Sequence, residues 1–207
     1  MWYLNRVNVY DKHNAMHIKK IEFLGSKILY KGWSVLEEYK LSYTRQDGSK
    51  DNQIREIYDS GDGAAVLLYN TQSRKIILIR QFRLAALLNG HPDGFIIECC
   101  AGMLDQQEPE VVIIREIEEE TGYKVTSVNK IYEAFATPGA HKEKIHFYVA
   151  EYDESMHFGK GGGLQSEQEE IEVLEFRFED LPQLLQNGTI IDAKTIILLQ
   201  WALLNLL

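Results

Sequence analysis

The chain has 207 residues, of which 45 % are hydrophobic and 26 % charged, and this composition excludes disordered and collagen-like classes. Lys and Arg number 22 against 31 Asp and Glu, a formal net charge of −9. Because a protein that binds nucleic acid needs a basic face, we expect no nucleic-acid partner. A small phosphorylated substrate stays possible where metal ions and a few arginines screen its charge.

The cysteines and the apolar stretches indicate the compartment. Cys99 and Cys100 are adjacent, so they form a poor structural disulfide and are expected to be reduced and buried. The first twenty residues contain no apolar segment of the kind that signal peptides carry. The stretch Ile196 to Leu207 is shorter than the about 20 residues that span a bilayer, and it predicts a buried terminal helix. We therefore predict a cytoplasmic protein with no membrane partner.

The first sixty residues have the pattern of a β-ribbon. Strands are predicted at Ile21 to Tyr30, Trp33 to Tyr43 and Gln53 to Tyr58, with a turn at Asp47-Gly48. Residues 1–15 show no clear period. We predict that residues 1–60 form an N-terminal β-ribbon unit, which is too small to hold a core of its own.

From Gly61 onward, short apolar strands alternate irregularly with few helices. This pattern predicts an α+β domain over residues 61–207, with a mixed β-sheet between helices. The Pro109 helix is bounded by its proline and by Gly122. The predicted strands are 64–69, 75–80, 95–100, 128–136, 145–150 and 171–178, and the predicted helices are 109–121, 181–186 and 193–205.

The Pro109 helix carries a run of carboxylates. At about 100° per residue, Glu116, Glu119 and Glu120 fall within about 100° of arc, while Glu118 points toward solvent. Oxygen ligands in this arrangement suit Mg²⁺ or Mn²⁺, which also bind phosphates. The alternative interpretation of such a run is a solvated acidic face.

The residues around this run favour the metal-binding interpretation. They resemble the Nudix box, G-x5-E-x7-R-E-U-x-E-E-x-G-U, in which U is a bulky aliphatic residue. Six residues rather than seven separate Glu108 from Arg115, which leaves the role of Glu108 open, and Tyr123 replaces the last aliphatic residue. The matching positions are Gly102, Glu108, Arg115, Glu116, Ile117, Glu119, Glu120 and Gly122.

The resemblance implies the Nudix fold and a hydrolase that uses divalent cations, with Mg²⁺ expected and Mn²⁺ a possible substitute. It makes Glu116, Glu120 and the carbonyl of Ala101 metal ligands. Glu119 would be a second ligand or would contact a metal-bound water, and Arg115 would orient the glutamates.

Over roughly residues 26–202 the chain is similar to the GDP-mannose pyrophosphatase group of that family. The similar segments include Arg55 to Asp59, Ile79 to Arg83 and Cys100 to Asp105. Enzymes of the group are homodimers whose N-terminal strands are swapped, so each site borrows residues from the partner. The resemblance therefore implies that the ribbon is a dimerisation arm.

The same resemblance implies the substrate contacts. Trp33 would stack on guanine, and Arg55 and Glu56 would contact the nucleotide, although Ile54 replaces a lysine of the group. The remaining contacts would be Arg83 to the diphosphate, Glu143 to the substrate and Lys194 to the sugar or a phosphate.

Glu169, which follows the run Gly161-Gly162-Gly163, matches a further metal ligand and possible general base. Because this loop is two residues longer than in the group, Glu167 and Glu170 are alternative candidates.

The predicted reaction is metal-dependent hydrolysis of GDP-mannose to GMP and mannose 1-phosphate. One alternative is an ADP-ribose or ADP-sugar pyrophosphatase, since Pro138 falls 15 residues after Tyr123, a spacing that also resembles those enzymes. The other is a Nudix module that senses a nucleotide sugar without cleaving it. The retained glutamates, and the lack of room for a helix-turn-helix domain, argue against the sensing module.

Overall fold

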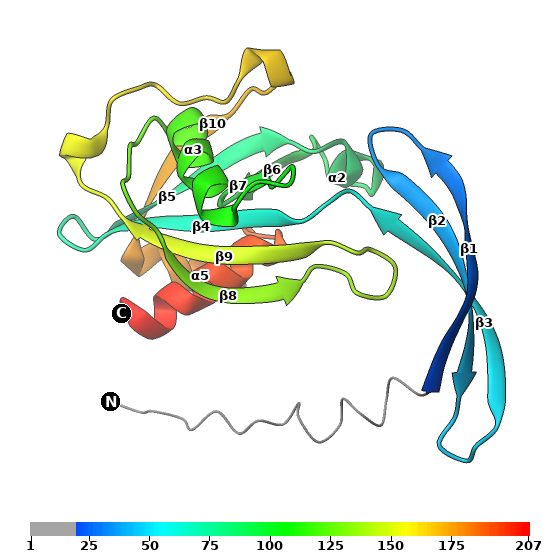
Figure 1. The fold of residues 1–207 in the computed structure, drawn as a ribbon. Helices are drawn as coiled ribbons and strands as arrows, with labels where there is room; N and C mark the ends of the chain where they lie inside the picture. The colour runs from blue at the N-terminus through cyan, green and yellow to red at the C-terminus, as the bar shows by residue number, and fades with distance from the viewer. Residues whose placement is uncertain (1–19) are drawn as a thin grey trace. The chain divides into compact units, whose positions relative to one another are not determined.

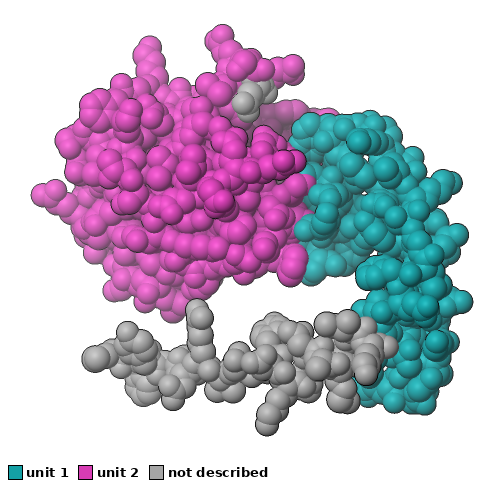
Figure 2. Space-filling model, viewed as in Figure 1, with its two compact units in different colours: residues 1–60, 137–142 teal, residues 61–136, 143–207 magenta. Residues whose placement is uncertain are grey.

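A computed structural model describes residues 20–207 of the chain (Figure 1). These residues separate into two compact units, coloured separately in Figure 2. The described part of unit 1 comprises residues 20–60 and the turn 137–142, and unit 2 comprises residues 61–136 and 143–207. The first nineteen residues of the predicted N-terminal unit lie outside the described residues.

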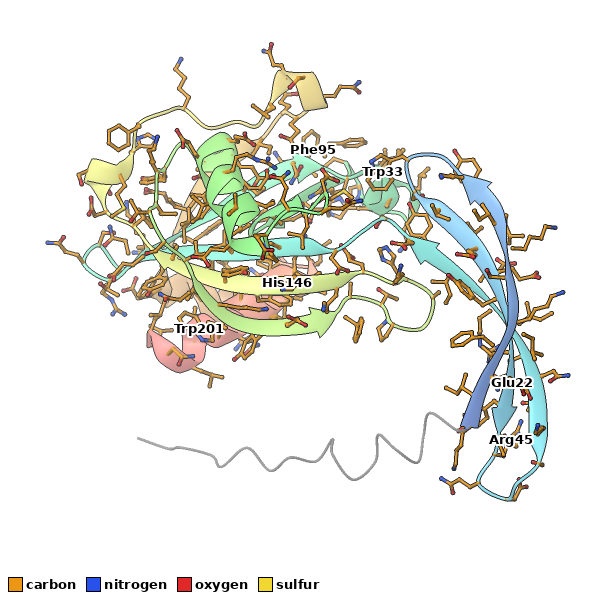
Figure 3. The ribbon with its side chains drawn as sticks, viewed as in Figure 1. Glu22, Trp33, Arg45, Phe95, His146 and Trp201 are labelled. Carbon is orange, nitrogen blue, oxygen red and sulfur yellow. The ribbon has the colours of Figure 1, made fainter. Side chains whose placement is uncertain are left out.

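Unit 1 is built on a three-stranded antiparallel sheet in the order β1-β2-β3. The strands are β1 (Ile21–Lys31), β2 (Val35–Thr44) and β3 (Lys50–Asp59), which confirms the predicted ribbon. One detail of the prediction was wrong. Trp33 does not begin the second strand but lies in the turn between β1 and β2, at one end of the ribbon (Figure 3).

The turn 137–142 is attached to the end of β3. The backbone N–H of Tyr58 donates to the carbonyl of Ala140, and that of Lys142 donates to the carbonyl of Tyr58. The Lys142 ammonium pairs with Asp59 at 2.6 Å. These bonds explain why six residues from the middle of the sequence belong to the N-terminal unit.

Unit 2 contains a mixed sheet, as predicted, and this sheet has seven strands rather than the predicted six. Its main path is β10-β5-β4-β9-β8, in which β4 and β9 are parallel and the other neighbours are antiparallel; β6 also pairs with β5, and β7 with β4. The strands are β4 (Gly63–Asn70), β5 (Lys75–Phe82), β6 (Phe95–Glu98), β7 (Cys100–Met103), β8 (Asn129–Phe135), β9 (Lys144–Glu151) and β10 (Glu172–Arg177).

The predicted single strand 95–100 is two strands, β6 and β7, interrupted at Cys99. The Cys99 N–H donates to the hydroxyl oxygen of Thr195, 2.7 Å away, instead of to a neighbouring strand. Both thiols are buried, as predicted, and burial raises the pKa of Cys99 to about 12. The short helix α2 (Leu84–Leu88) was not predicted, because none of its residues is buried and its sequence has no amphipathic period.

The three longer helices end where their sequence signals predict. They are α3 (Pro109–Thr121), α4 (Leu181–Gln186) and α5 (Ala193–Asn205), and single 3₁₀ turns lie at Glu154–Met156, Gln165–Glu167 and Phe178–Asp180. Within residues 20–207, none of the helices combines the length and the hydropathy needed to cross a membrane.

Helices cover both faces of the large sheet (Figure 1). Alternate side chains of β4 point to opposite faces. Ala64, Val66 and Leu68 pack in the core on the α3 side, whereas Ala65 and Leu67 pack with α4 and α5. On the second face, Trp201 of α5 (Figure 3) has its ring 6.1 Å from that of Tyr69. The predicted sheet between helices is therefore confirmed, and it fixes the position of α3.

Candidate active site

The carboxylate helix α3 is anchored by its apolar face. Pro109 occupies the first turn, where its missing N–H costs nothing, and Gly122 ends the helix with a φ of +77° that favours glycine. Val112, Ile113 and Ile117 are completely buried against the sheet. Because this face packs against the sheet, Glu120 is buried and Glu116 and Glu119 are partly buried. Glu118 is exposed, as predicted.

Glu120 is the most buried carboxylate of this group, with 2 % of its surface exposed. Its Oε2 accepts a hydrogen bond of 3.2 Å from the N–H of Ala101. Burial raises the pKa of Glu120 to about 8, and the charges of Glu116 and Glu169 contribute to the shift, while bonds from Cys100 and Ala101 oppose it. A bound cation would stabilise the charged form of the carboxylate in this buried environment.

Glu116 depends on the glycine that precedes the helix. A Cβ atom at Gly102 would lie 2.4 Å from Glu116 Cγ and 2.5 Å from its Oε1. Only a residue without a side chain therefore leaves room for this carboxylate. Arg115 donates to Glu116 at 3.1 Å and lies 3.7 Å from Glu119, so it contacts two of the glutamates that it was predicted to orient.

The run Gly161-Gly162-Gly163 brings Glu169 near the C-terminal end of α3. The N–H groups of Gly162 and Gly163 donate to the carbonyls of Glu120 and Glu119, which have no partner within the helix. A Cβ at Gly163 would lie 2.6 Å from Glu169 Oε2. That same oxygen accepts a 3.0 Å bond from the N–H of Leu164.

The charge of Glu169 acts on two carboxyl groups of α3, Glu116 and Glu120. Glu169 contributes to raising the pKa of both helix carboxyls, for which burial is the larger cause. Of the alternative loop candidates, Glu170 is exposed. In the part of the chain that the structure describes, no three His, Cys, Asp or Glu side chains converge tightly enough to hold a metal ion by themselves. The donor set is nevertheless made of hard oxygens, which is the chemistry that Mg²⁺ and Mn²⁺ prefer.

Arg83 and Lys194, two predicted substrate residues, share one carboxylate. Arg83 Nε donates to Glu98 Oε2 at 2.7 Å, and Lys194 Nζ donates to Glu98 Oε1 at 2.6 Å. Glu98 is 4 % exposed, so both of its oxygens are satisfied by cations at a buried position. The structure thus brings together the end of β5, β6 and the first turn of α5.

The α5 side of this group is fixed by a helix cap. Asp192 accepts bonds from the N–H of Thr195 at 2.9 Å and from Lys194 Nζ at 2.9 Å. Burial alone would lower the pKa of Lys194, but the charges of Glu98 and Asp192 outweigh burial and hold the pKa above its ordinary value. Lys194 is therefore a permanently charged group at neutral pH.

Glu143 lies beside the strand that carries the box glycine. A Cβ at Gly63 would be 3.5 Å both from Glu143 Oε1 and from the carbonyl oxygen of Gly102. Gly63 and Gly102 lie at adjoining register positions of β4 and β7. Glu143 is therefore near the same end of β7 as Glu116.

Trp33, Arg55 and Glu56 belong to unit 1. Trp33 is 75 % exposed, so it is not the core residue that strand tryptophans often are. Arg55 is exposed and donates to Gln53 at 2.9 Å, and Glu56 is exposed on the same strand. Their predicted contacts with a nucleotide remain predictions.

Sequence reasoning missed Glu98 and Asp192. Glu98 gave a usable signal, because it is the one acidic residue in the apolar stretch Phe95 to Cys100 and a buried charge must be paired. Tyr123, which departs from the box, is buried with its ring 4.7 Å from that of Tyr152. The aromatic residue thus fills the space that the box pattern gives to an aliphatic one.

A mixed sheet between helices, with Glu116 and the buried Glu120 of one helix held against the strand that carries Gly102, defines a hydrolase of the Nudix class. Comparison with known families agrees, because the NUDIX domain matches residues 59–199. The chain belongs to the Nudix hydrolase family. Residues 20–58 match a second family, described as the GDP-mannose pyrophosphatase NudK N-terminal domain.

Several curated relatives are similar over most of the chain. A GDP-mannose pyrophosphatase of Cronobacter sakazakii is 48 % identical over 180 residues, which cover 87 % of this chain and 93 % of that protein. One of Pectobacterium atrosepticum is 45 % identical over 89 % of this chain and 95 % of its own length. Among solved structures, an ADP compounds hydrolase superposes with a TM-score of 0.66 over 88 % of this chain and 94 % of that one. Its identity of 17 % makes it evidence for the fold alone.

Proposed function

We propose that this protein hydrolyses the diphosphate of a nucleotide sugar with Mg²⁺, and that GDP-mannose is the substrate, giving GMP and mannose 1-phosphate. The observation that carries the proposal is the group formed by the buried Glu120 with the partly buried Glu116, beside Gly102, and Glu169, beside Gly163. The match of residues 20–58 and the names of the relatives support the choice of GDP-mannose.

Glu116, Glu120 and the Ala101 carbonyl are the proposed ligands of the cation, with Glu169 as a further ligand. Mg²⁺ keeps several waters and commonly uses one or two protein carboxylates, so a closed cage of side chains is not required. Mn²⁺ has similar oxygen preferences and is expected to substitute. A bound cation of this kind neutralises phosphate charge and lowers the pKa of a coordinated water.

The chain's own residues then divide the work of hydrolysis. Water adds to one phosphorus of the diphosphate, the bridging P–O bond breaks, and the leaving phosphate takes the bond electrons. Glu169 is the proposed general base that accepts the proton from the water, with Glu167 and Glu170 as the alternatives. Arg115 holds the glutamates, and Arg83 offers the forked donors that suit a diphosphate.

We further propose that unit 1 is a dimerisation arm that completes the site of a second copy with Trp33, Arg55 and Glu56. All residues of β1 are exposed, and large apolar side chains project from the ribbon without cover in the described chain: Phe23 is 72 % exposed, Tyr30 61 % and Ile54 57 %. A three-stranded sheet with so much exposed apolar surface is typical of an interaction surface. Sedimentation is expected to give twice the 23.9 kDa of one chain. A monomer that is fully active at nanomolar concentration would refute the shared site.

A product assay tests the reaction. GDP-mannose, ADP-ribose and other nucleotide sugars are incubated with Mg²⁺, and the nucleotide and sugar phosphate are quantified. GDP-mannose is expected to have the highest kcat/KM. A better result with ADP-ribose would refute the guanine preference but not the metal mechanism. Excess EDTA should abolish activity, and Glu120→Gln should lower kcat at least ~10²-fold, the size of a major electrostatic loss.

A further inference from the structure

Glu98 bonds to both Arg83 and Lys194, to which the family resemblance assigns two separate substrate contacts. Its two carboxylate oxygens accept one bond each, from Arg83 Nε at 2.7 Å and from Lys194 Nζ at 2.6 Å. Arg83 lies directly after β5 and Lys194 in the first turn of α5, so 111 positions of sequence separate them. The single carboxylate sets the distance between these two charges.

The burial of Glu98 makes this arrangement rigid. Its side chain is 5 % exposed, whereas that of Arg83 is 43 % exposed and that of Lys194 16 %. A buried carboxylate that lost either cation would be left with an unsatisfied oxygen, which costs free energy of folding. The cations therefore hold the orientation that Glu98 imposes, and do not turn freely into solvent.

Both cations keep donors for a ligand. The bond to Glu98 uses only Nε of the five guanidinium N–H donors of Arg83. Lys194 uses two of its three ammonium donors, on Glu98 and on Asp192. Asp192 is in turn held by the backbone N–H of Thr195, so the far side of the group is fixed as well.

We propose that Glu98 is a positioning residue, which holds Arg83 and Lys194 at a fixed separation so that both bind the phosphates of one nucleotide sugar. This inference rests on the proposed function of the site. Glu98 itself touches no substrate. It acts through the two cations, so its loss should weaken substrate binding without changing the need for the metal.

Glu98→Gln tests the inference with little change of shape. The amide keeps one acceptor oxygen but turns an N–H₂ donor toward the other cation, so one of the two loses its partner. We expect the KM for GDP-mannose to rise at least tenfold, while the Mg²⁺ concentration that gives half-maximal activity changes less than twofold. Glu98→Asp, which keeps the charge but is too short to reach both cations, should raise KM similarly and serves if the amide variant does not fold.

Glu175→Gln is the matched control. Glu175 on β10 forms an exposed ion pair with Lys75 on β5, at 2.6 Å. This variant therefore removes the same charge from an ion pair that lies outside the proposed site. Its KM should equal that of the wild type. In a background of Arg83→Ala with Lys194→Ala, adding Glu98→Gln should leave KM unchanged within twofold, because no cation remains to be positioned.

Calorimetric titration with GDP in the presence of Mg²⁺ separates the two proposals. A Kd for GDP at least tenfold weaker in Glu98→Gln supports positioning, even if the wild type fails to cleave GDP-mannose and the proposed function is wrong. An active wild type whose Glu98→Gln variant loses kcat and melting temperature but keeps KM and Kd would overturn the positioning role. A wild type that neither binds GDP nor cleaves GDP-mannose would overturn both proposals.

Discussion

Replacing Gly102 by alanine should damage the active site while sparing the fold. Gly102 is not among the glycines with positive φ, so alanine can adopt its backbone conformation. The added Cβ would lie 2.4 Å from Glu116 Cγ, whereas non-bonded carbons sit about 3.5 Å apart or more. The Glu116 side chain must therefore move by about 1 Å.

The two consequences of that movement differ in size. A displacement of about 1 Å in a catalytic group can cost ~10²-fold in rate, so we expect Gly102→Ala to lower kcat by about that factor. Glu116 is a flexible side chain, and forcing it off its preferred rotamer costs about 1 kcal/mol. In a chain of this length that lowers the melting temperature by only about 2–4 °C.

The assay measures GDP-mannose turnover against Mg²⁺ concentration, together with thermal unfolding. Gly139→Ala is the control, because nothing lies within 4 Å of its added Cβ. Adding Gly102→Ala to Glu116→Ala should cause little further loss, since the alanine acts through Glu116. Wild-type turnover by Gly102→Ala would refute the reasoning, and so would a full additional loss in the double variant.

Three other changes test separate parts of the molecule. Gly122→Ala should lower the melting temperature more than Gly102→Ala does. Gly122 has a φ of +77°, and an added Cβ would lie 2.3 Å from a backbone carbonyl oxygen that cannot turn away. An equal or smaller shift in melting temperature would contradict this reasoning. Trp33→Ala should raise the KM for GDP-mannose about 5- to 100-fold with a smaller effect on kcat, as expected for a loss of base stacking, and an unchanged KM would argue against that contact. Bonds from Lys130 and then Lys144 hold the pKa of Glu133 at about 2, below its ordinary 4.5, so its contribution to stability is present above pH 4.5 and is lost as the pH falls toward 2. Urea midpoints of Glu133→Gln should therefore fall less steeply than those of the wild type over that range, and the difference should shrink in high salt because the ion pairs are exposed.

The boundaries of α3 could be predicted because their causes are local. Pro109 and Gly122 act on the residues beside them, and the apolar spacing between them needs no knowledge of the partner strand. The division between β6 and β7 has a distant cause. The hydroxyl of Thr195, 96 positions later, takes the N–H of Cys99, and no local pattern announces that bond.

The carboxylates of the site show the same distinction. Helical periodicity was enough to group Glu116, Glu119 and Glu120, because all three are on one element. Glu169 was proposed from the resemblance alone, and its place near the last turn of α3 needed the structure, since it depends on how the glycine run bonds to that turn. Trp33 was assigned to a strand because aromatic residues favour strands, and this preference was given more weight than the turn preference of its neighbours Gly32 and Ser34.

In the proposed function, the two charged groups of unit 2 have different roles in binding an anionic substrate. Around α3 the negative groups outnumber the nearby cation Arg115, so this end of the site favours a divalent metal. In the other group, Arg83 and Lys194 are balanced by Glu98 and Asp192, so it exerts little net attraction at a distance. In a chain of net charge −9, we therefore expect the long-range attraction for a diphosphate to come from the metal, and the balanced group to supply geometry. This division is the reason why loss of Glu98 should appear in substrate affinity, and loss of Glu120 in metal dependence and rate.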